Sequence, residues 1–284
     1  LNVNFCVLFR KNAIAFHPID GNIMWAGAPS GGLWKTTDGG TSWSLAGTDQ
    51  LPVIGVSAIL VHPANPDIIY IGTGDRDGAD TYGMGVFKTT DGGANWSQMN
   101  TGMGDETVGM MAMHPNNPDT ILAATSGGIF KTTDGGNSWT RTSSNTDHYK
   151  DLRLKPGDPN IAYTTEGGNF YRSANNGDSW SFVSNGLSNN TRMVIGVTPA
   201  DPSVVYCVLT SGTFVGLFKS TDSGLSFTNM SGNNPTNIMG YTDGDNLSQA
   251  WYDLCVAVSP TNADQVYIGS INIHRTNNSG SSFT

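Results

Sequence analysis

Short apolar runs separated by turn-forming residues cover almost the whole chain. The first set comprises Ala13–Phe16, Ile23–Ala26, Leu33–Thr36 and Ser42–Leu45, with Pro and Gly in the turns between them. Within Leu33–Thr36 apolar and polar residues alternate, which is typical of a half-buried β-strand. No stretch has the 3.6-residue periodicity of a helix of normal length. The pattern therefore predicts four short antiparallel strands joined by tight turns.

This four-strand unit occurs six times, and each copy carries the same nine-residue motif. The motif reads Lys-Thr-Thr-Asp-Gly-Gly-Thr-Ser-Trp in its first copy. The copies span Lys35–Trp43, Lys88–Trp96, Lys131–Trp139, Arg172–Trp180, Lys219–Phe227 and Arg275–Phe283. Their closing aromatic residues are 53, 43, 41, 47 and 56 residues apart. Such regular spacing indicates a repeat architecture in which each copy is one supersecondary unit.

A single four-stranded sheet cannot bury both of its faces, so the copies are expected to pack face to face. The sequence predicts an all-β fold, a β-propeller of four-stranded antiparallel blades that is six-bladed or an incomplete seven-bladed ring. An open solenoid or a β-sandwich is the alternative. The propeller is expected over 13–284, after an N-terminal strand or a non-native leader at 1–12. The expected blades are 13–48, 57–100, 109–143, 150–185, 193–231 and 252–284.

Composition and charge restrict the partners. The net charge is −9 and no basic stripe is present, which argues against nucleic acid. No apolar run approaches the roughly 20 residues that span a bilayer, so membrane insertion is not expected. Cys207 and Cys255 lie in apolar runs and are expected to be buried thiols. The chain begins at Leu1 and ends inside an expected strand at Thr284, so we expect further domains of a longer polypeptide.

The nine-residue motif is expected to be structural. Asp38 can accept hydrogen bonds from the backbone of its own turn, Gly39 and Gly40 allow unusual backbone angles, and Trp43 is expected to pin the turn to its blade. Later copies replace Asp by Asn and Trp by Phe, changes that a structural turn tolerates. The structural residues expected in these motifs are Asp38, Trp43, Asp91, Trp96, Asp134, Trp139, Trp180, Asp222 and Phe227.

The motif Thr36-x-Asp38-x-Gly40-x-Ser42-Trp43 resembles the Asp-box, or BNR repeat, of sialidases, sortilin-type domains and glycoside hydrolase family 74 xyloglucanases. Together with the His-Pro-x-Asn-Pro turns, it is most similar to secreted bacterial propellers described as glycosyl-hydrolase-like or sortilin-like. The resemblance covers Ala13 to Thr284. It implies a β-propeller and an extracellular or cell-surface location. The resembling families include hydrolases, receptors and assembly factors, so it does not imply one function.

Strand direction predicts where a site lies. If the four strands alternate in direction, the Asp-box turns and the His-Pro turns share one end of each blade, called here the bottom end. The turns between second and third strands, and the links between blades, share the opposite end, called here the top end. Sequence differences between the repeats are concentrated at the top end, where function is expected.

Two top-end segments are longer than their counterparts, Gly72–Gly85 and Asn229–Tyr252. Acidic residues beside aromatic residues could bind a polysaccharide or a protein, because aromatic rings stack and carboxylates accept hydrogen bonds. A solvated loop surface without a ligand is the alternative. The candidate ligand-binding residues are Asp75, Asp77, Asp80, Tyr82, Asp105, Glu106, Tyr241, Trp251 and Tyr252.

Calcium is a candidate cofactor, and no other cofactor is expected. Asp75, Asp77 and Asp80 could supply clustered oxygens, although their spacing does not match an EF-hand loop. His17 and its counterparts at His62 and His114 precede Pro in equivalent turns. Because later copies replace them by Lys, Thr and Ser, we expect them to pack the turn.

Enzyme chemistry finds little support in the residues. In family 74 hydrolases the base is an Asp in the turn after the second strand. In the first repeat Pro29 occupies that position, and in the second repeat Asp75 lies one residue after it, which makes Asp75 a weak catalytic candidate. The acid of that family comes from a second propeller. Sialidase chemistry needs three arginines and a Tyr nucleophile, and no such set is evident. We therefore expect a binding or interaction scaffold; the alternative is a xyloglucanase-like or β-glucanase-like glycoside hydrolase whose second catalytic domain is missing from this chain.

Overall fold

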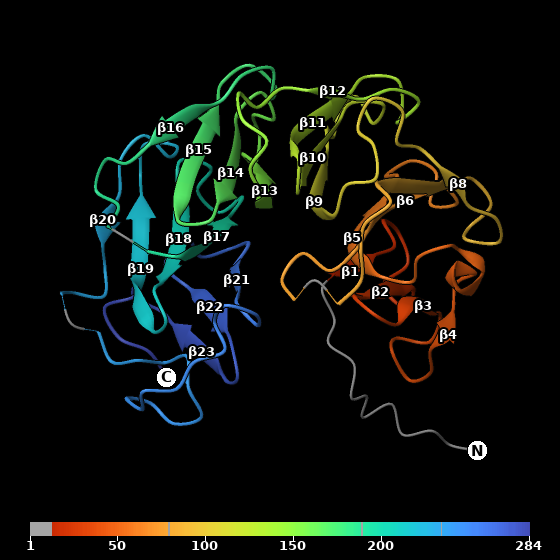
Figure 1. Cartoon of the computed structure of the whole chain (residues 1–284). Coiled ribbons are helices and arrows are strands. Elements are labelled where there is room, and N and C mark those ends of the chain that lie inside the picture. Colours follow the sequence, from red (N-terminus) through yellow and green to blue (C-terminus); the bar gives the residue numbers. More distant parts are fainter. Residues whose placement is uncertain (1–12, 79, 189, 234) are drawn as a thin grey trace. The chain divides into compact units, whose positions relative to one another are not determined.

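The computed structural model describes residues 13–78, 80–188, 190–233 and 235–284. The expected N-terminal strand or leader at 1–12 lies outside the described residues. The chain forms two compact units, Leu1–Lys150 and Asp151–Thr284. Each unit consists of short antiparallel sheets in which consecutive strands pair (Figure 1).

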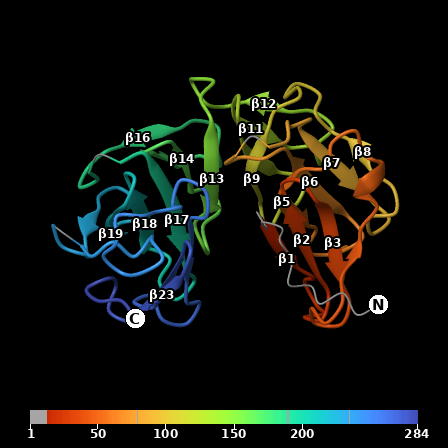
Figure 2. The ribbon, with the colours of Figure 1, turned by 60° about the horizontal axis from the view of Figure 1, so that its bottom comes forward.

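The first unit contains three four-stranded sheets. The first sheet is formed by β1 (Ala13–Phe16), β2 (Met24–Ala28), β3 (Gly32–Thr36) and β4 (Ser44–Leu45), and is followed by a single 3-10 turn, Thr48–Gln50. The second is formed by β5 (Val56–Val61), β6 (Ile69–Thr73), β7 (Val86–Thr89) and β8 (Ser97–Gln98). The third is formed by β9 (Val108–Met113), β10 (Ile121–Thr125), β11 (Gly128–Thr132) and β12 (Thr140–Arg141). The first strands β1, β5 and β9 lie side by side (Figure 2).

The second unit, whose first strand begins with Tyr149 and Lys150 at the end of the first unit, continues the same order. The fourth sheet is formed by β13 (Tyr149–Leu154), β14 (Ala162–Glu166), β15 (Asn169–Ser173) and β16 (Ser181–Val183). The fifth is formed by β17 (Arg192–Val197), β18 (Val205–Thr210), β19 (Phe214–Ser220) and β20 (Thr228–Asn229). The sixth is formed by β21 (Cys255–Val258), β22 (Val266–Gly269) and β23 (Ile273–Thr276). Thr284 exchanges two backbone hydrogen bonds of 2.8 Å with Arg275, which is the pairing of a fourth strand.

A turn precedes the first strand of the sixth repeat, which begins at Cys255 within the expected blade 252–284. The backbone N–H groups of Tyr252 and Asp253 both donate to the Gln249 carbonyl, so these residues form a turn before the strand. Cys255 is exposed, so the expectation that its thiol is buried is wrong. Cys207 is buried, as expected.

The two kinds of bottom-end turn are hydrogen bonded to each other in every repeat. In the first repeat the N–H of Gly39, in the Asp-box, donates to the carbonyl of Asn22, in the turn after β1, at 3.0 Å. The other five pairs, donor first, are Gly92 and Asp67, Gly135 and Asp119, Asn176 and Asn160, Ser223 and Ser203, and Ser279 and Asp264. The Asp-box turns and the turns after the first strands therefore share one end of each blade.

Buried side chains between consecutive sheets form the core of each unit. Ile69, Ile71 and Phe87 pack with Trp25 and Leu33 between the first two sheets. Close approach requires small residues at some positions: a Cβ on Gly27 would lie 2.7 Å from Cγ1 of Val56. The six sheets are the blades of an all-β propeller, because each is an antiparallel four-strand repeat that buries its faces against its neighbours.

The Asp-box tryptophans do not simply pin their own turns. The indole N–H of Trp96 donates to the Ala46 carbonyl at 3.1 Å, and that of Trp139 to the Met99 carbonyl at 2.8 Å. Both acceptors belong to the preceding repeat, so these rings join consecutive blades. The Trp43 indole N–H, in contrast, donates to the Gly40 carbonyl within its own turn at 3.2 Å, as expected. The sequence could not show this difference because the partners are non-local.

Candidate functional site

The Asp-box carboxylate is the centre of a local hydrogen-bond network. The Oδ1 atom of Asp38 accepts from the Thr36 hydroxyl at 2.8 Å and from the Ser42 backbone N–H at 2.9 Å, and its Oδ2 accepts from the Ser42 hydroxyl at 2.6 Å. The Thr36 hydroxyl also accepts from the Gly40 N–H at 3.0 Å. Equivalent bonds surround Asp91, Asp134 and Asp222. These carboxylates are occupied in holding their turns.

Two repeats replace the carboxylate by an amide and keep the network. The Oδ1 atom of Asn175 accepts from the Ser173 hydroxyl at 2.9 Å and from the Ser179 N–H at 3.0 Å, while its Nδ2 donates to the Ser179 hydroxyl at 2.9 Å. Asn278 makes the same three bonds. The serine hydroxyl changes from donor to acceptor, so Asn can replace Asp without losing a bond.

These networks lower the pKa values of the motif aspartates. The hydroxyl and the backbone N–H of Ser42 hold the pKa of Asp38 at about 2, and Ser138 does the same for Asp134. The Asn95 side chain contributes most to the pKa of about 2 at Asp91. At Asp222 burial acts to raise the pKa, but hydrogen bonds from Ser226 and Ser220 lower it to about 2. A carboxylate that is ionised and hydrogen bonded in this way is a poor general acid at neutral pH.

The histidines of the bottom-end turns also act locally. Nδ1 of His17 accepts from the Asp20 N–H at 2.9 Å, and Nδ1 of His62 accepts from the Asn65 N–H at 3.1 Å. In the fifth repeat the Thr198 hydroxyl takes the same role, accepting from the Ala200 N–H at 3.1 Å. The side chains at this position close a turn.

At the top end, the loop Gly72–Gly85 is braced from within by Asp75. This carboxylate is 3% exposed and accepts from the backbone N–H groups of Asp77 and Gly78 at 3.0 Å each, and of Asp80 at 3.3 Å. The Asp75 N–H donates back to the Thr81 carbonyl at 2.9 Å. Asp75 therefore organises the loop backbone, which corrects the picture of Asp75 as an available carboxylate.

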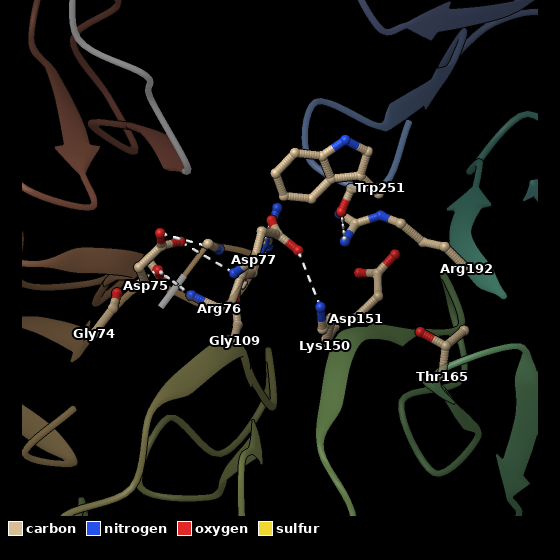
Figure 3. Close-up of polar contacts among 12 residues, drawn as sticks. Gly74, Asp75, Arg76, Asp77, Gly109, Lys150, Asp151, Thr165, Arg192 and Trp251 are labelled. Atoms are coloured by element: carbon tan, nitrogen blue, oxygen red, sulfur yellow. Dashed lines mark hydrogen bonds and ion pairs between the residues drawn. The ribbon is translucent and has the colours of Figure 1, made fainter. Parts of the chain in front are cut away.

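A charged cluster lies beside this loop in the first unit (Figure 3). Nε of Arg76 lies 3.1 Å from Oδ2 of Asp77, and Nη1 of Arg76 donates to the Gly109 carbonyl at 3.1 Å. Nζ of Lys150 lies 3.6 Å from Oδ1 of Asp77. The Asp77 side chain is 1% exposed, whereas that of Lys150 is 30% exposed. The buried carboxylate thus holds two cations next to the first strand of the third blade.

The calcium hypothesis does not fit this geometry. Asp75 and Asp77 direct their oxygens to backbone N–H groups and to cations, and Asp80 is exposed. Among residues 13–78, 80–188, 190–233 and 235–284, no three His, Cys, Asp or Glu side chains converge where they could hold a metal ion. We therefore derive no metal chemistry at this site.

The other top-end candidates of the first unit differ in availability. Tyr82 is 82% exposed. Asp105 accepts from the side-chain amides of Gln98 and Asn100, at 3.1 and 2.8 Å. Glu106 accepts from the Ser126 hydroxyl at 2.5 Å. The Tyr82 side chain is thus open to solvent, whereas Asp105 and Glu106 are hydrogen bonded.

The second unit carries its own top-end group. Trp251 and Tyr241 are each 61% exposed, and the rings of Trp251 and Tyr252 lie 4.9 Å apart. Nη1 of the buried Arg192 donates to the Trp251 carbonyl at 3.0 Å, which fixes the backbone beneath the indole (Figure 3). The aromatic side chains here are presented on a fixed backbone.

Sequence reasoning missed Asp151. Its carboxylate is buried and accepts from the Ile195 N–H at 2.8 Å, while Nη1 of Arg153 lies 2.9 Å from its other oxygen. Arg76 and Lys150 of the first unit were missed as well. The available signal was the charged pair Lys150–Asp151 inside the first strand of a repeat, where the other copies are apolar.

Comparisons with known proteins agree with the repeat pattern. The family model described as photosynthesis system II assembly factor YCF48 matches residues 81–272, which is more than half of the chain. A solved structure of YCF48 bound to D1 peptide is similar with a TM-score of 0.64 and 16% identity, covering 97% of this chain and 80% of that chain. No curated protein sequence matches significantly.

Glycoside hydrolases share the fold. An ancestral family 74 enzyme is similar with a TM-score of 0.70 and 18% identity, over 97% of this chain and 38% of that chain. The family 74 xyloglucanase from Xanthomonas campestris is similar with a TM-score of 0.71 and 16% identity, covering 97% of this chain and 45% of that chain. The chain thus spans less than half of the length of these two enzymes. In the described part of the chain, no helix has the length and apolar character needed to cross a membrane.

Proposed function

The chain belongs to the family of the photosynthesis system II assembly factor YCF48, and from this we propose that it is a binding propeller that holds a segment of a partner protein at the top end of its blades. Propellers serve many functions, so the proposal rests on the site and not on the fold. A family relative whose structure is described as bound to D1 peptide supports a peptide ligand.

One observation carries the proposal: hydrogen bonds brace the loop around Asp75, and this loop presents an aromatic side chain at Tyr82. Asp75 accepts three backbone N–H groups inside the loop, and the Thr81 hydroxyl ties it to the Pro29 carbonyl of the preceding blade at 2.6 Å. Next to this anchor Tyr82 is almost fully exposed. A preorganised loop with an exposed tyrosine is suited to binding, because little conformational entropy is lost on contact.

The charged cluster adds polar recognition. Arg76 and Lys150 are held by the buried Asp77 and remain partly exposed, with side chains 16% and 30% accessible. Such groups can pair with carboxylates or carbonyl groups of a peptide. In the second unit, Trp251 offers a further aromatic surface.

The alternative is a glycoside hydrolase, and the similarity to family 74 enzymes keeps it as a second candidate. Inverting hydrolysis needs two carboxylates about 6.5–9.5 Å apart, one protonated and one ionised. Asp75 is committed to the loop backbone, which favours binding over catalysis. We also propose that the protein acts outside the cytoplasm. A solved structure of similar fold, described as an extracellular domain from B. thetaiotaomicron, supports this location.

The proposal is tested by incubating the full chain with peptides and, separately, with polysaccharides. A phage-displayed library of random peptides should yield a family of peptides that compete with one another for the protein. Xyloglucan and β-glucan should release no reducing sugar on incubation with it. Reducing-sugar release that disappears in Asp75→Ala would favour the hydrolase, and a library that yields no competing peptide would contradict the proposal.

A further inference from the structure

A pocket of about 340 Å³ lies in the second unit between the link Asn229–Tyr252 and the sixth Asp-box. Its polar lining includes the hydroxyl-bearing residues Ser231, Thr236, Ser281 and Ser282. Asp243 is the charged residue of the lining, and Phe283 provides an aromatic wall. Neither the Asp-box pattern nor the proposed peptide site accounts for this pocket.

The link that borders the pocket makes contacts that differ from those of its counterparts. In the third and fifth repeats, the aromatic residue that closes the Asp-box donates its backbone N–H to the preceding link: Trp139 to Thr101 at 2.9 Å, and Phe227 to Asn185 at 3.0 Å. Before the sixth repeat the link is longer. Asn272 donates its side-chain amide to the carbonyls of Gly240 and Tyr241, which draws the link toward the β22–β23 turn.

The link is held firmly where it borders the pocket. The side-chain amide of Asn237 donates to the Asp245 and Leu247 carbonyls at 2.9 Å each. Asp245 accepts from the backbone N–H groups of Thr242 and Leu247 at 3.0 and 2.9 Å. These bonds hold the backbone of the turn that carries Asp243, whose side chain is 59% exposed.

A buried imidazole lies beside Asp243. His274 is 8% exposed, and its Nε2 is buried without a hydrogen-bond partner. This nitrogen lies 3.5 Å from Oδ1 of Asp243, within ion-pair distance if the ring is protonated. A buried nitrogen without a partner is unfavourable, and such groups in native structures need an explanation. Asp243, which lines the pocket, therefore has a buried imidazole within ion-pair distance behind it.

We infer that this pocket binds a neutral polyhydroxylated ligand of the size of one sugar ring. Its volume is at the low end for ligand pockets, which suits a single ring. Four hydroxyl side chains and one carboxylate match the alternating donors and acceptors of sugar hydroxyls, and Phe283 can pack against the apolar face of a ring. The inference goes beyond the proposed protein ligand and does not depend on it.

Saturation-transfer difference NMR on the full chain tests the inference. The probes are D-glucose, D-galactose, D-mannose, D-xylose and N-acetyl-D-glucosamine, with putrescine as a cationic comparison. At least one sugar should bind saturably. Asp243→Asn should weaken the affinity for that sugar by about tenfold, because the loss of a hydrogen bond to a charged group has an effect of this order. Thr236→Val, which removes one hydroxyl at nearly constant volume, should weaken it less.

Asp49→Asn is the matched control, because it removes one exposed carboxylate in the other unit. Its affinity for the sugar should equal that of the unchanged protein. Absence of saturable binding by every sugar would overturn the inference. So would equal affinity in Asp243→Asn, or binding of putrescine in place of the sugars.

Discussion

Nζ of Lys88 lies 3.1 Å from the carbonyl oxygen of Gly135, and this hydrogen bond joins the Asp-box of the second repeat to that of the third. The hydroxyl of Tyr70 donates to the same oxygen at 3.0 Å, and the ammonium lies 5.0 Å from the centre of the Tyr70 ring. Lys88 and Tyr70 thus both donate hydrogen bonds to the Asp-box turn of the next repeat. The first residue of the motif is thus a connector between blades.

The second unit repeats this arrangement with different atoms. Nζ of Lys219 and the hydroxyl of Tyr206 both contact the Ser279 hydroxyl, at 2.9 and 2.8 Å. Nε of Arg172 donates to the Ser223 carbonyl at 2.8 Å. Because the contact recurs in three places, we expect it to stabilise the propeller and not to serve a ligand.

Removal of the Tyr70 hydroxyl should therefore destabilise the protein. Tyr70→Phe should lower the free energy of unfolding by about 1 kcal/mol, the net value of a typical hydrogen bond. Tyr163→Phe is the matched control, since the buried Tyr163 hydroxyl lies near Ser223 but makes no hydrogen bond of ordinary length and angle; burial raises its pKa to about 12. The control should be as stable as the unchanged protein or more stable. Urea denaturation measures both, and equal losses in the two variants would contradict the connector role.

The Asp-box should tolerate an amide better than a methyl group. Asp222→Asn should keep the bonds that Asn175 and Asn278 make in their repeats, whereas Asp222→Ala leaves Ser226 and Ser220 without their acceptor. We expect a clearly lower melting temperature only for Asp222→Ala, by a few degrees, since about 1 kcal/mol corresponds to roughly 2–4 °C in chains somewhat shorter than this one. Differential scanning fluorimetry would detect the difference, and similar melting temperatures would argue against the network.

Acid should weaken the propeller through the same residues. The pKa values of Asp38, Asp91, Asp134 and Asp222 are about 2 in the folded protein, below the ordinary value of 3.8. Their contribution to stability is present above pH 4 and is lost as the pH falls through 4 toward 2, because the unfolded chain takes up protons first. Urea unfolding at pH 5 and pH 3 should show this loss.

A variant with all four aspartates changed to Asn is the control for the acid prediction. It should lose less stability between pH 5 and pH 3 than the unchanged protein. An identical pH dependence would show that other carboxylates are responsible.

Asp75 should control the order of its loop. In Asp75→Ala three backbone N–H groups, those of Asp77, Gly78 and Asp80, lose their acceptor. Loss of bonds worth about 1–1.5 kcal/mol should speed hydrogen exchange of these amides roughly tenfold. NMR-detected exchange would measure it, with the Gly92 amide as internal reference. Unchanged exchange within the loop would contradict the bracing role.

The repeat sequence was sufficient to predict the blades, the number of strands and the shared end of the Asp-box and His-Pro turns. These features depend on local alternation and on turn residues, which are visible in one chain. The partners of Trp139 and Lys88 were not predictable, since both contact a different repeat. Asp75 was misread for a similar reason: the sequence identifies a carboxylate in a loop but not the direction in which it points.

The most direct test of the proposed function is the affinity of a selected peptide for Tyr82→Ala, measured by isothermal titration calorimetry. Tyr82 is 82% exposed on the braced loop, and Leu225→Ala provides a control, since Leu225 is 55% exposed in the fifth Asp-box at the bottom end. Loss of a contacting tyrosine typically costs about 2 kcal/mol or more at a hot spot, so Tyr82→Ala should weaken binding by at least about tenfold. Leu225→Ala should not. Equal affinities in the unchanged protein and Tyr82→Ala would contradict a binding role for this loop.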